Sequence, residues 1–180
     1  MKRLLLVVLG FSVLFACQQL KEAGTPTQPV HTSSYLLQLN AIIELAEPAH
    51  LDLPAHVIHE SVREPLTNVY APASLYDFYH ECELARENAQ TPTAFDVYAT
   101  AQEALLFRLA ELPDEASAKY LVDLYADPQL HFDAARQLSL GEAMVHCGDR
   151  IVPHLTKVKD LRPTISTRVL ECIRTGRSYL

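Results

Sequence analysis

The chain of 180 residues contains no tryptophan and only five glycines. Glycine is the usual residue of tight turns, so its scarcity argues against a many-stranded β-sandwich. After residue 16 there is no apolar run long enough to cross a bilayer as a helix. The chain also lacks a GxSxG nucleophile elbow, a P-loop and a dinucleotide-binding fingerprint, which are common sequence signs of hydrolases, nucleotide-binding proteins and dehydrogenases.

Basic residues are scarce outside the C-terminal end of the chain. Residues 17–145 carry 6 Lys and Arg against 19 Asp and Glu, whereas residues 146–180 carry 7 against 3. The formal net charge is −7, so nucleic acid is not an expected partner. The basic end is either a solvated surface or a face that binds an acidic partner or anionic head groups. The residues that would form this binding face are Lys157, Lys159, Arg162 and Arg168.

The first 17 residues have the layout of a secretory signal. Lys2 and Arg3 precede a 13-residue uncharged run, Leu4–Ala16, and Cys17 follows it directly. The run is too short to span a bilayer with its ends exposed. We therefore expect residues 1–16 to be a signal peptide.

The stretch Leu14-Phe15-Ala16-Cys17 resembles the lipobox of bacterial lipoproteins. This resemblance implies that Cys17 is acylated, for example with palmitate, and holds the protein at a membrane. Gln18 stands where aspartate would imply retention in the inner membrane, so the resemblance implies the outer membrane, facing the periplasm. Plain secretion and a retained apolar anchor are the alternatives.

Residues 18–33 are rich in proline, threonine and glutamine and have little to bury. They are typical of a flexible linker between the lipidated Cys17 and a folded domain, which we expect over residues 34–180. Apolar residues recur with helical period through that domain, and nothing alternates with period two for long enough to form a strand. The predicted fold class is therefore all-α. The predicted helices are Tyr35–Glu47, Pro54–Glu64, Ser74–Asn88, Pro92–Glu111 capped by Thr91, Asp114–Ala126, His131–Cys147, Asp149–Lys159 and Pro163–Thr175.

The second half of the domain shows a further regularity. Residues 148–160 (GDRIVPHLTKVKD) resemble the HEAT-like repeats of α-solenoids, in which a Gly-Asp turn breaks a long helix and a first-turn proline follows. The resemblance is clearest over residues 112–176 and implies stacked antiparallel helical hairpins. It also implies a non-catalytic protein-binding function, because stacked hairpins form extended binding surfaces.

Two pairs of similar residues indicate the length of the repeat. Asp114 and Asp149 are 35 residues apart, and Leu121 and Leu155 are 34 apart. At the corner between two helices we expect Gly148 to adopt a left-handed conformation and Asp149 to cap the following helix.

Three cysteines remain besides Cys17, and each lies on an apolar helical stripe. One interpretation is that Cys82, Cys147 and Cys172 are small buried apolar residues. The alternative is a disulfide between Cys147 and Cys172, which end equivalent helices of adjacent units in an exported protein.

The densest group of histidines is His50, His56 and His59, followed by Glu60. His56, His59 and Glu60 would share one helix face. Their HxxHE order is not the HExxH arrangement, however, and no fourth ligand is spaced to complete a tetrahedral zinc site. A solvated helix face is the simpler interpretation, and a metal site is the alternative.

Together these observations predict a lipid-anchored, non-catalytic scaffold or adaptor that binds a protein of the bacterial cell envelope, with no cofactor. An inhibitor- or immunity-type lipoprotein is the first alternative. The second is a metal-dependent hydrolase that uses His50, His56 and His59.

Overall fold

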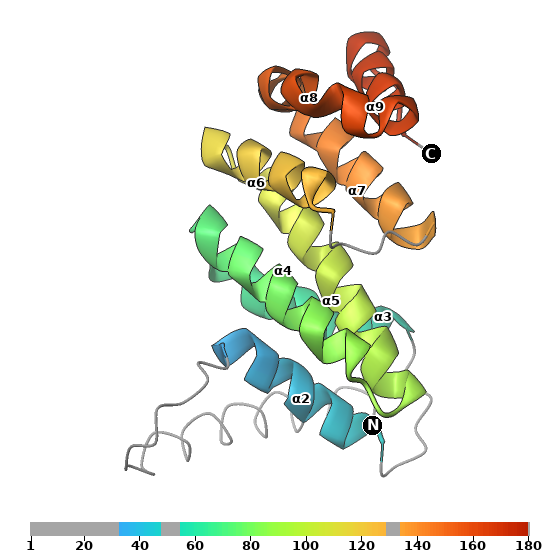
Figure 1. Ribbon diagram of the computed structural model, residues 1–180. Coiled ribbons are helices and arrows are strands. Elements are labelled where there is room, and N and C mark those ends of the chain that lie inside the picture. The colour runs from blue at the N-terminus through green and yellow to red at the C-terminus, as the bar shows by residue number, and fades with distance from the viewer. Residues whose placement is uncertain (1–32, 48–54, 129–133, 180) are drawn as a thin grey trace.

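The computed structural model describes residues 33–47, 55–128 and 134–179, and every regular element within these ranges is a helix (Figure 1). The predicted all-α class is confirmed for this part of the chain. The α-helices are α2 (Ser34–Ala46), α3 (Ala55–Arg63), α4 (Pro72–Glu87), α5 (Pro92–Glu111), α6 (Glu115–Ala126), α7 (Ala134–Cys147), α8 (Val152–Val158) and α9 (Pro163–Thr175). Short 3₁₀ helices are η1 (Glu64–Asn68), η2 (Gly148–Ile151) and η3 (Lys159–Leu161).

Proline and capping residues set several of these boundaries as predicted. Thr91 is the N-cap of α5, and its hydroxyl accepts a hydrogen bond from the Ala94 N–H at 3.2 Å. The α9 helix begins at Pro163 and ends before Gly176, whose φ of 65° is left-handed. The predicted signal peptide, Cys17 and His50 lie outside the described residues.

The helix predicted over residues 149–159 is wrong as a single element. Pro153 has no N–H to donate to the carbonyl of Asp149, and the N–H of Val152 bonds that oxygen in a 3₁₀ turn instead. Gly148 has the expected left-handed conformation, with φ 67°. Asp149 is not the cap that we predicted, because it lies inside η2 and the N-cap of α8 is Ile151.

Consecutive helices alternate between two layers (Figure 1). In one layer α2 packs against α4, α4 against α6, and α6 against α8. In the other layer α3 packs against α5, α5 against α7, and α7 against α9. A helix buries only part of its circumference against one neighbour, so contacts to the next helix and to the next but one bury a wider face.

The α5 helix is the centre of the core. It contacts α2, α3, α4, α6 and α7, and its Leu105 and Leu109 are fully buried. Burial on several sides fits its sequence, in which apolar residues are not confined to one stripe. None of the described helices combines the length and hydropathy required to cross a membrane.

Arginine side chains donate hydrogen bonds to main-chain carbonyls at the ends of helices around this core. Arg150, in η2, donates to the carbonyl oxygens of Ala110 and Leu112 where α5 ends, with 2.7 Å to the Ala110 oxygen. Arg162 donates to the carbonyl of Asp127 after α6, and its guanidinium lies 5.6 Å from the centre of the Tyr125 ring. These carbonyls have no further helical N–H to bond, so the arginines bond them, and the Leu112 oxygen also accepts from the Ser117 hydroxyl.

Candidate functional site

A cleft of about 430 Å³ opens between α3, α4, α5 and α7. The α5 helix contributes Asp96, Thr100, Gln102 and Glu103 to the lining. Asp96, Thr100 and Glu103 recur at helical spacing, and Gln102 lies to one side of that row. The surrounding helices contribute apolar groups, among them Ile58 of α3. Most of its lining residues carry a polar or charged group, so the cleft is more polar than the usual small-molecule site.

Gln102 is an almost fully buried polar residue of the cleft, with 2% of its surface exposed. Its side-chain oxygen accepts a hydrogen bond from Arg86 of α4 at 3.2 Å. Because a guanidinium only donates, the oxygen of the amide must face Arg86, and this fixes the position of the amide nitrogen. That nitrogen is buried and has no hydrogen-bond partner. Gln102 therefore keeps a buried, unsatisfied donor beside the cleft.

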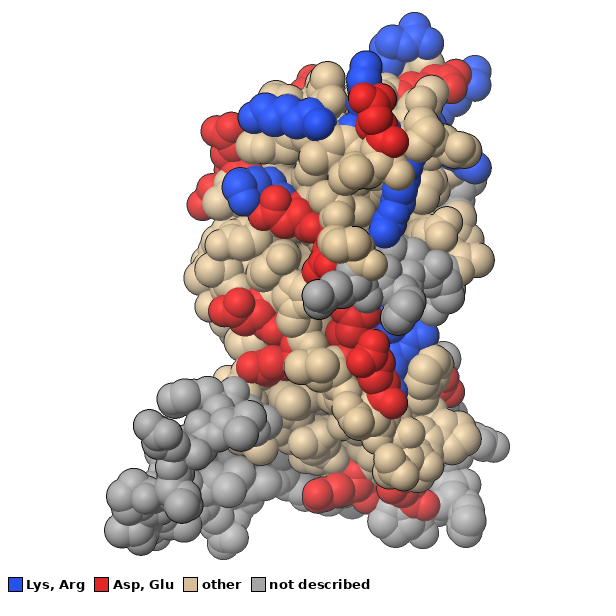
Figure 2. Space-filling model, viewed as in Figure 1, with Lys and Arg blue, Asp and Glu red and all other residues tan. Residues whose placement is uncertain are grey.

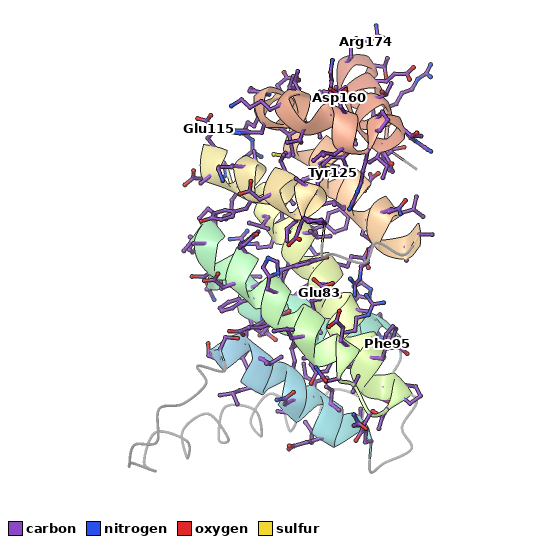
Figure 3. All side chains as sticks on the ribbon, viewed as in Figure 1. Glu83, Phe95, Glu115, Tyr125, Asp160 and Arg174 are labelled. Atoms are coloured by element: carbon purple, nitrogen blue, oxygen red, sulfur yellow. The ribbon has the colours of Figure 1, made fainter. Side chains whose placement is uncertain are left out.

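A buried ion pair forms another wall of the cleft. Arg136 of α7 is bonded to Glu83 of α4, and their side chains are 12% and 9% exposed. Figure 3 shows Glu83 at mid-height of the molecule, in the C-terminal half of α4. The pair joins helices that are far apart in the sequence, so it holds the cleft walls together.

Two carboxylates of α5 also line the cleft. Asp96 and Glu103 are seven residues apart on α5, with Thr100 between them. Neither forms an ion pair with a basic side chain among the described residues. The ring of Phe95 lies 4.3 Å from the guanidinium of Arg86, next to Asp96, and Figure 3 shows Phe95 at the start of α5.

The basic C-terminal end is a second candidate surface. Figure 2 shows lysine and arginine side chains gathered at the upper end of the molecule, which is formed by α8 and α9 in Figure 1. Lys157, Lys159, Arg174 and Arg177 are exposed there. Arg174 points away from the core in Figure 3, so these groups face solvent.

Two of the four predicted face residues also hold the fold together. Arg162 bonds the carbonyl of Asp127, as described above. Arg168 donates to the carbonyl of Tyr179, and its guanidinium lies 4.7 Å from the centre of the Tyr179 ring. Tyr179 is 5% exposed, and its N–H donates to the Glu142 carboxylate at 3.0 Å. Sequence patterning identified the charges but not these contacts, which depend on how the last residues return to α7.

The histidines do not form a cluster in the described part of the chain. His56 and His59 are exposed on α3, and His59 also borders the cleft. No group of three His, Cys, Asp or Glu residues with metal-binding geometry is found among the described residues. His50, the remaining member of the predicted cluster, lies outside them.

Cys82, Cys147 and Cys172 are buried free thiols, so the bridge between Cys147 and Cys172 is not formed in this structure. Desolvation, with a smaller contribution from the Glu81 charge, raises the pKa of Cys82 to about 12. Desolvation also raises the pKa of Cys147, against the lowering effect of Arg150. Both groups are protonated thiols at neutral pH, which is the unreactive form.

Sequence reasoning missed the polar residues of the cleft. The available signal was Gln102 itself, a polar residue beside Ala101 and Leu105 on a helix otherwise patterned for burial. Arg86 and Arg136 each follow an alanine and precede a polar residue, as many surface arginines of helices do, so nothing local distinguishes them.

Comparison with protein-family models, with curated proteins and with solved structures finds no match.

Proposed function

We propose that the protein is a non-catalytic binding scaffold of the bacterial cell envelope, anchored by lipid at Cys17 and built as a HEAT-like α-solenoid. The observation that carries this proposal is the alternation of helices between two layers, in which each helix packs against the next but one. Stacked helical pairs of this kind present long continuous surfaces, and such surfaces most often bind other proteins.

Residues at equivalent positions support the repeat interpretation. Leu121 of α6 and Leu155 of α8, 34 residues apart in the sequence, are both fully buried. The α6 and α8 helices are neighbours in one layer, and each follows a helix of the other layer. Gly148 makes the left-handed corner between α7 and the short helices that follow. These features are those expected of successive helical hairpins.

The basic end of the molecule is the proposed contact surface for an acidic envelope protein. Residues 146–180 have an excess of basic side chains, whereas the rest of the chain after residue 16 is acidic. Exposed charges of this kind act mainly on the association rate, and their effect falls as salt rises. Binding through this surface is therefore expected to weaken with ionic strength.

A charge-reversed variant tests the contact surface. The substitutions Lys157→Glu, Lys159→Glu, Arg174→Glu and Arg177→Glu change only exposed groups and leave Arg162 and Arg168, which hold the fold, in place. Crosslinking in intact envelopes, followed by recovery of the protein, should lose at low salt the partners that the unchanged chain recovers. The matched control replaces the same four residues by Arg, Arg, Lys and Lys, which keeps their charge. Recovery of the same partners by the reversed variant would show that the basic end does not bind them.

The recovered partner also separates a scaffold from an inhibitor-type lipoprotein. A scaffold leaves the activity of its partner intact, whereas an inhibitor lowers it on addition of the purified protein. An activity assay of the partner with and without this chain distinguishes the two functions.

Lipid anchoring is tested separately by Cys17→Ser. Without the thiol there is no acylation site, so the precursor should keep its apolar run and fail to mature. Acyl chains contribute about 0.8 kcal/mol of membrane affinity per buried methylene, so loss of the lipid also changes partitioning. Normal maturation and membrane association of the Ser variant would exclude the lipoprotein interpretation.

A further inference from the structure

We propose that the basic end binds the outer face of α2 in a second copy of this chain, so that copies join head to tail. This pairing rests on the proposed function, in which the basic end is a contact surface, and it names the acidic protein that meets that end. Three features support it: the exposed apolar side of α2, the opposite charges of the two ends, and the order in which the helices stack.

The outer face of α2 is apolar although it is exposed. The buried side of the helix carries Tyr35, Leu39 and Ile43 and packs against α3, α4 and α5. Leu37 and Leu45 point away from that side, and they are 46% and 43% exposed. No described helix precedes α2 in the chain. The end of a repeat stack normally presents a polar face, because no further repeat covers it. An apolar face at this end is therefore typical of a helix that another surface covers.

Carboxylates accompany the two leucines. Glu44 is exposed and lies seven residues after Leu37, which places both on the same side of the helix. Glu47, also exposed, is the C-cap, and α2 contains no lysine, arginine or histidine. A surface that covers the outer face of α2 must therefore offer positive charge beside an apolar group.

The basic end of the same chain offers both. Over residues 152–179 the exposed basic residues, Lys157, Lys159, Arg168, Arg174 and Arg177, outnumber the exposed acidic ones, Asp160 and Glu171. Leu161, in η3 between α8 and α9, is 61% exposed. The two ends of the chain are thus complementary in charge, and each exposes leucine.

The stacking order explains how one end continues the other. The α2 and α8 helices are the first and last described members of one layer, and Figure 1 shows them at opposite ends of the molecule. In a head-to-tail pair, α2 of one copy would follow α8 of the other, as α8 follows α6 within a chain. Helical repeats propagate through such nearest-neighbour contacts. A contact between two different surfaces does not close on itself, so it builds a series of oligomers.

The charges disfavour two other occupants of the outer face of α2. A symmetric dimer through two α2 helices would place Glu44 and Glu47 of both copies in one interface, where like charges repel. Anionic lipid head groups would repel the same carboxylates. The basic end of a second copy instead brings opposite charges together.

Sedimentation velocity of the full chain, purified in a large molar excess of mild detergent, tests the pairing. At low salt the unchanged chain should form dimers, trimers and longer species as its concentration rises. The mean mass should fall toward that of the monomer as salt screens the contact. Association through shared micelles would instead persist in salt and would be the same in every variant.

Two variants each remove one end of the contact. The α2 variant carries Leu37→Gln, Glu44→Gln and Leu45→Gln, and the basic-end variant carries Lys157→Glu, Lys159→Glu, Arg174→Glu and Arg177→Glu. All of these positions are exposed, and both new residues are good helix formers, so the fold should persist. Each variant alone should associate at least about 10-fold more weakly than the unchanged chain.

An equimolar mixture of the two variants is the decisive sample. Each variant keeps the end that the other lacks, so the mixture should form dimers and nothing larger. The matched control carries Asp77→Asn, Leu84→Gln and Leu138→Gln, which change an exposed carboxylate and two exposed leucines on α4 and α7. This control should associate like the unchanged chain.

Three results would overturn the head-to-tail pairing. They are a chain that stays monomeric at low salt up to millimolar concentration, a mixture that stays monomeric, and a basic-end variant that dimerises alone, which would mean that two α2 faces pair. None of these results decides whether the basic end binds another envelope protein, because the crosslinking experiment with the charge-reversed variant measures that separately.

Discussion

Arginine side chains bond different acceptors in two regions of the protein. These regions are the body, over its described residues 33–128, and the C-terminal unit, residues 134–179. In the body, Arg63 and Arg108 both approach the Glu111 carboxylate, at 3.6 and 3.2 Å. In the C-terminal unit, Arg150 and Arg162 donate to main-chain carbonyls at the ends of α5 and α6, and Arg168 donates to the carbonyl of Tyr179. The division is not absolute, since Arg108 also donates to the carbonyls of Thr67 and Val69.

The difference explains how the C-terminal unit remains basic. A carbonyl at the end of a helix is uncharged but lies at the negative end of the helix dipole, so it attracts a guanidinium without neutralising it. Arginines that bond carbonyls therefore need few acidic side chains nearby. The two uses of arginine meet at Arg136, which begins the C-terminal unit but bonds Glu83 of the body.

The largest expected effect comes from breaking that junction with Arg136→Leu. The substitution leaves the Glu83 carboxylate buried without its cation, so we expect the free energy of unfolding to fall by about 3–5 kcal/mol. Urea denaturation measures the loss. The double variant Glu83→Leu/Arg136→Leu should recover most of it, because it removes both charges.

The matched control is Arg63→Leu, which breaks the pair with Glu111 at a side chain that is 60% exposed. An exposed pair contributes about 0–1 kcal/mol, so this variant should unfold close to the unchanged protein. Equal losses for Arg63→Leu and Arg136→Leu would mean that burial does not determine the strength of these pairs.

The sequence predicted most of what local chemistry determines. Thr91 with Pro92, and Pro163 with Gly176, are signals read within a few residues, and α5 and α9 were predicted to start at the residues where the structure places them. The continuous helix over residues 149–159 was wrong because Pro153 acts on a carbonyl four residues earlier, and this favours a 3₁₀ turn.

The cleft could not be predicted from local patterns. Arg86 and Gln102 are 16 residues apart, and Glu83 and Arg136 are 53 apart. Only the packing of α4 against α5, and of α5 against α7, brings them together. Similarly, the charges of Arg162 and Arg168 are visible in the sequence, but their main-chain acceptors are not. Long-range acceptors have no sequence signature, whereas caps and turns do.

The second prediction concerns an arginine that bonds main-chain carbonyls. Arg150→Ala removes the guanidinium that donates to the carbonyls of Ala110 and Leu112, while the Leu112 oxygen keeps the hydroxyl of Ser117. Hydrogen bonds that involve a charged group contribute about 1.5–3 kcal/mol, so the free energy of unfolding should fall by about 2–3 kcal/mol. Arg150→Lys should lose less, because one ammonium group keeps the charge but cannot bond both oxygens with the geometry of the guanidinium fork. A Lys variant as unstable as the Ala variant would show that charge alone contributes nothing there.

The smallest expected effect concerns Gly141 of α7, where Tyr179 near the end of the chain packs against this helix. An alanine in the middle of a helix is normally more stable than glycine by about 1 kcal/mol. Here a Cβ atom would overlap the ring of Tyr179, which packs directly on Gly141. Gly141→Ala should therefore lower the free energy of unfolding by about 1–2 kcal/mol, since overpacking costs about 1–3 kcal/mol and the terminal residues can move aside.

A double-mutant cycle with Tyr179→Ala isolates the contact between Gly141 and Tyr179. Once the ring is absent, nothing opposes the helix preference, so Gly141→Ala should become stabilising by up to about 1 kcal/mol. The sign of the substitution thus depends on whether the chain end covers α7. If Gly141→Ala stabilises the protein with Tyr179 present, the ring does not occupy this position in solution. The end of the chain would then not pack on α7, and Arg168 would lose the carbonyl and the ring that hold it.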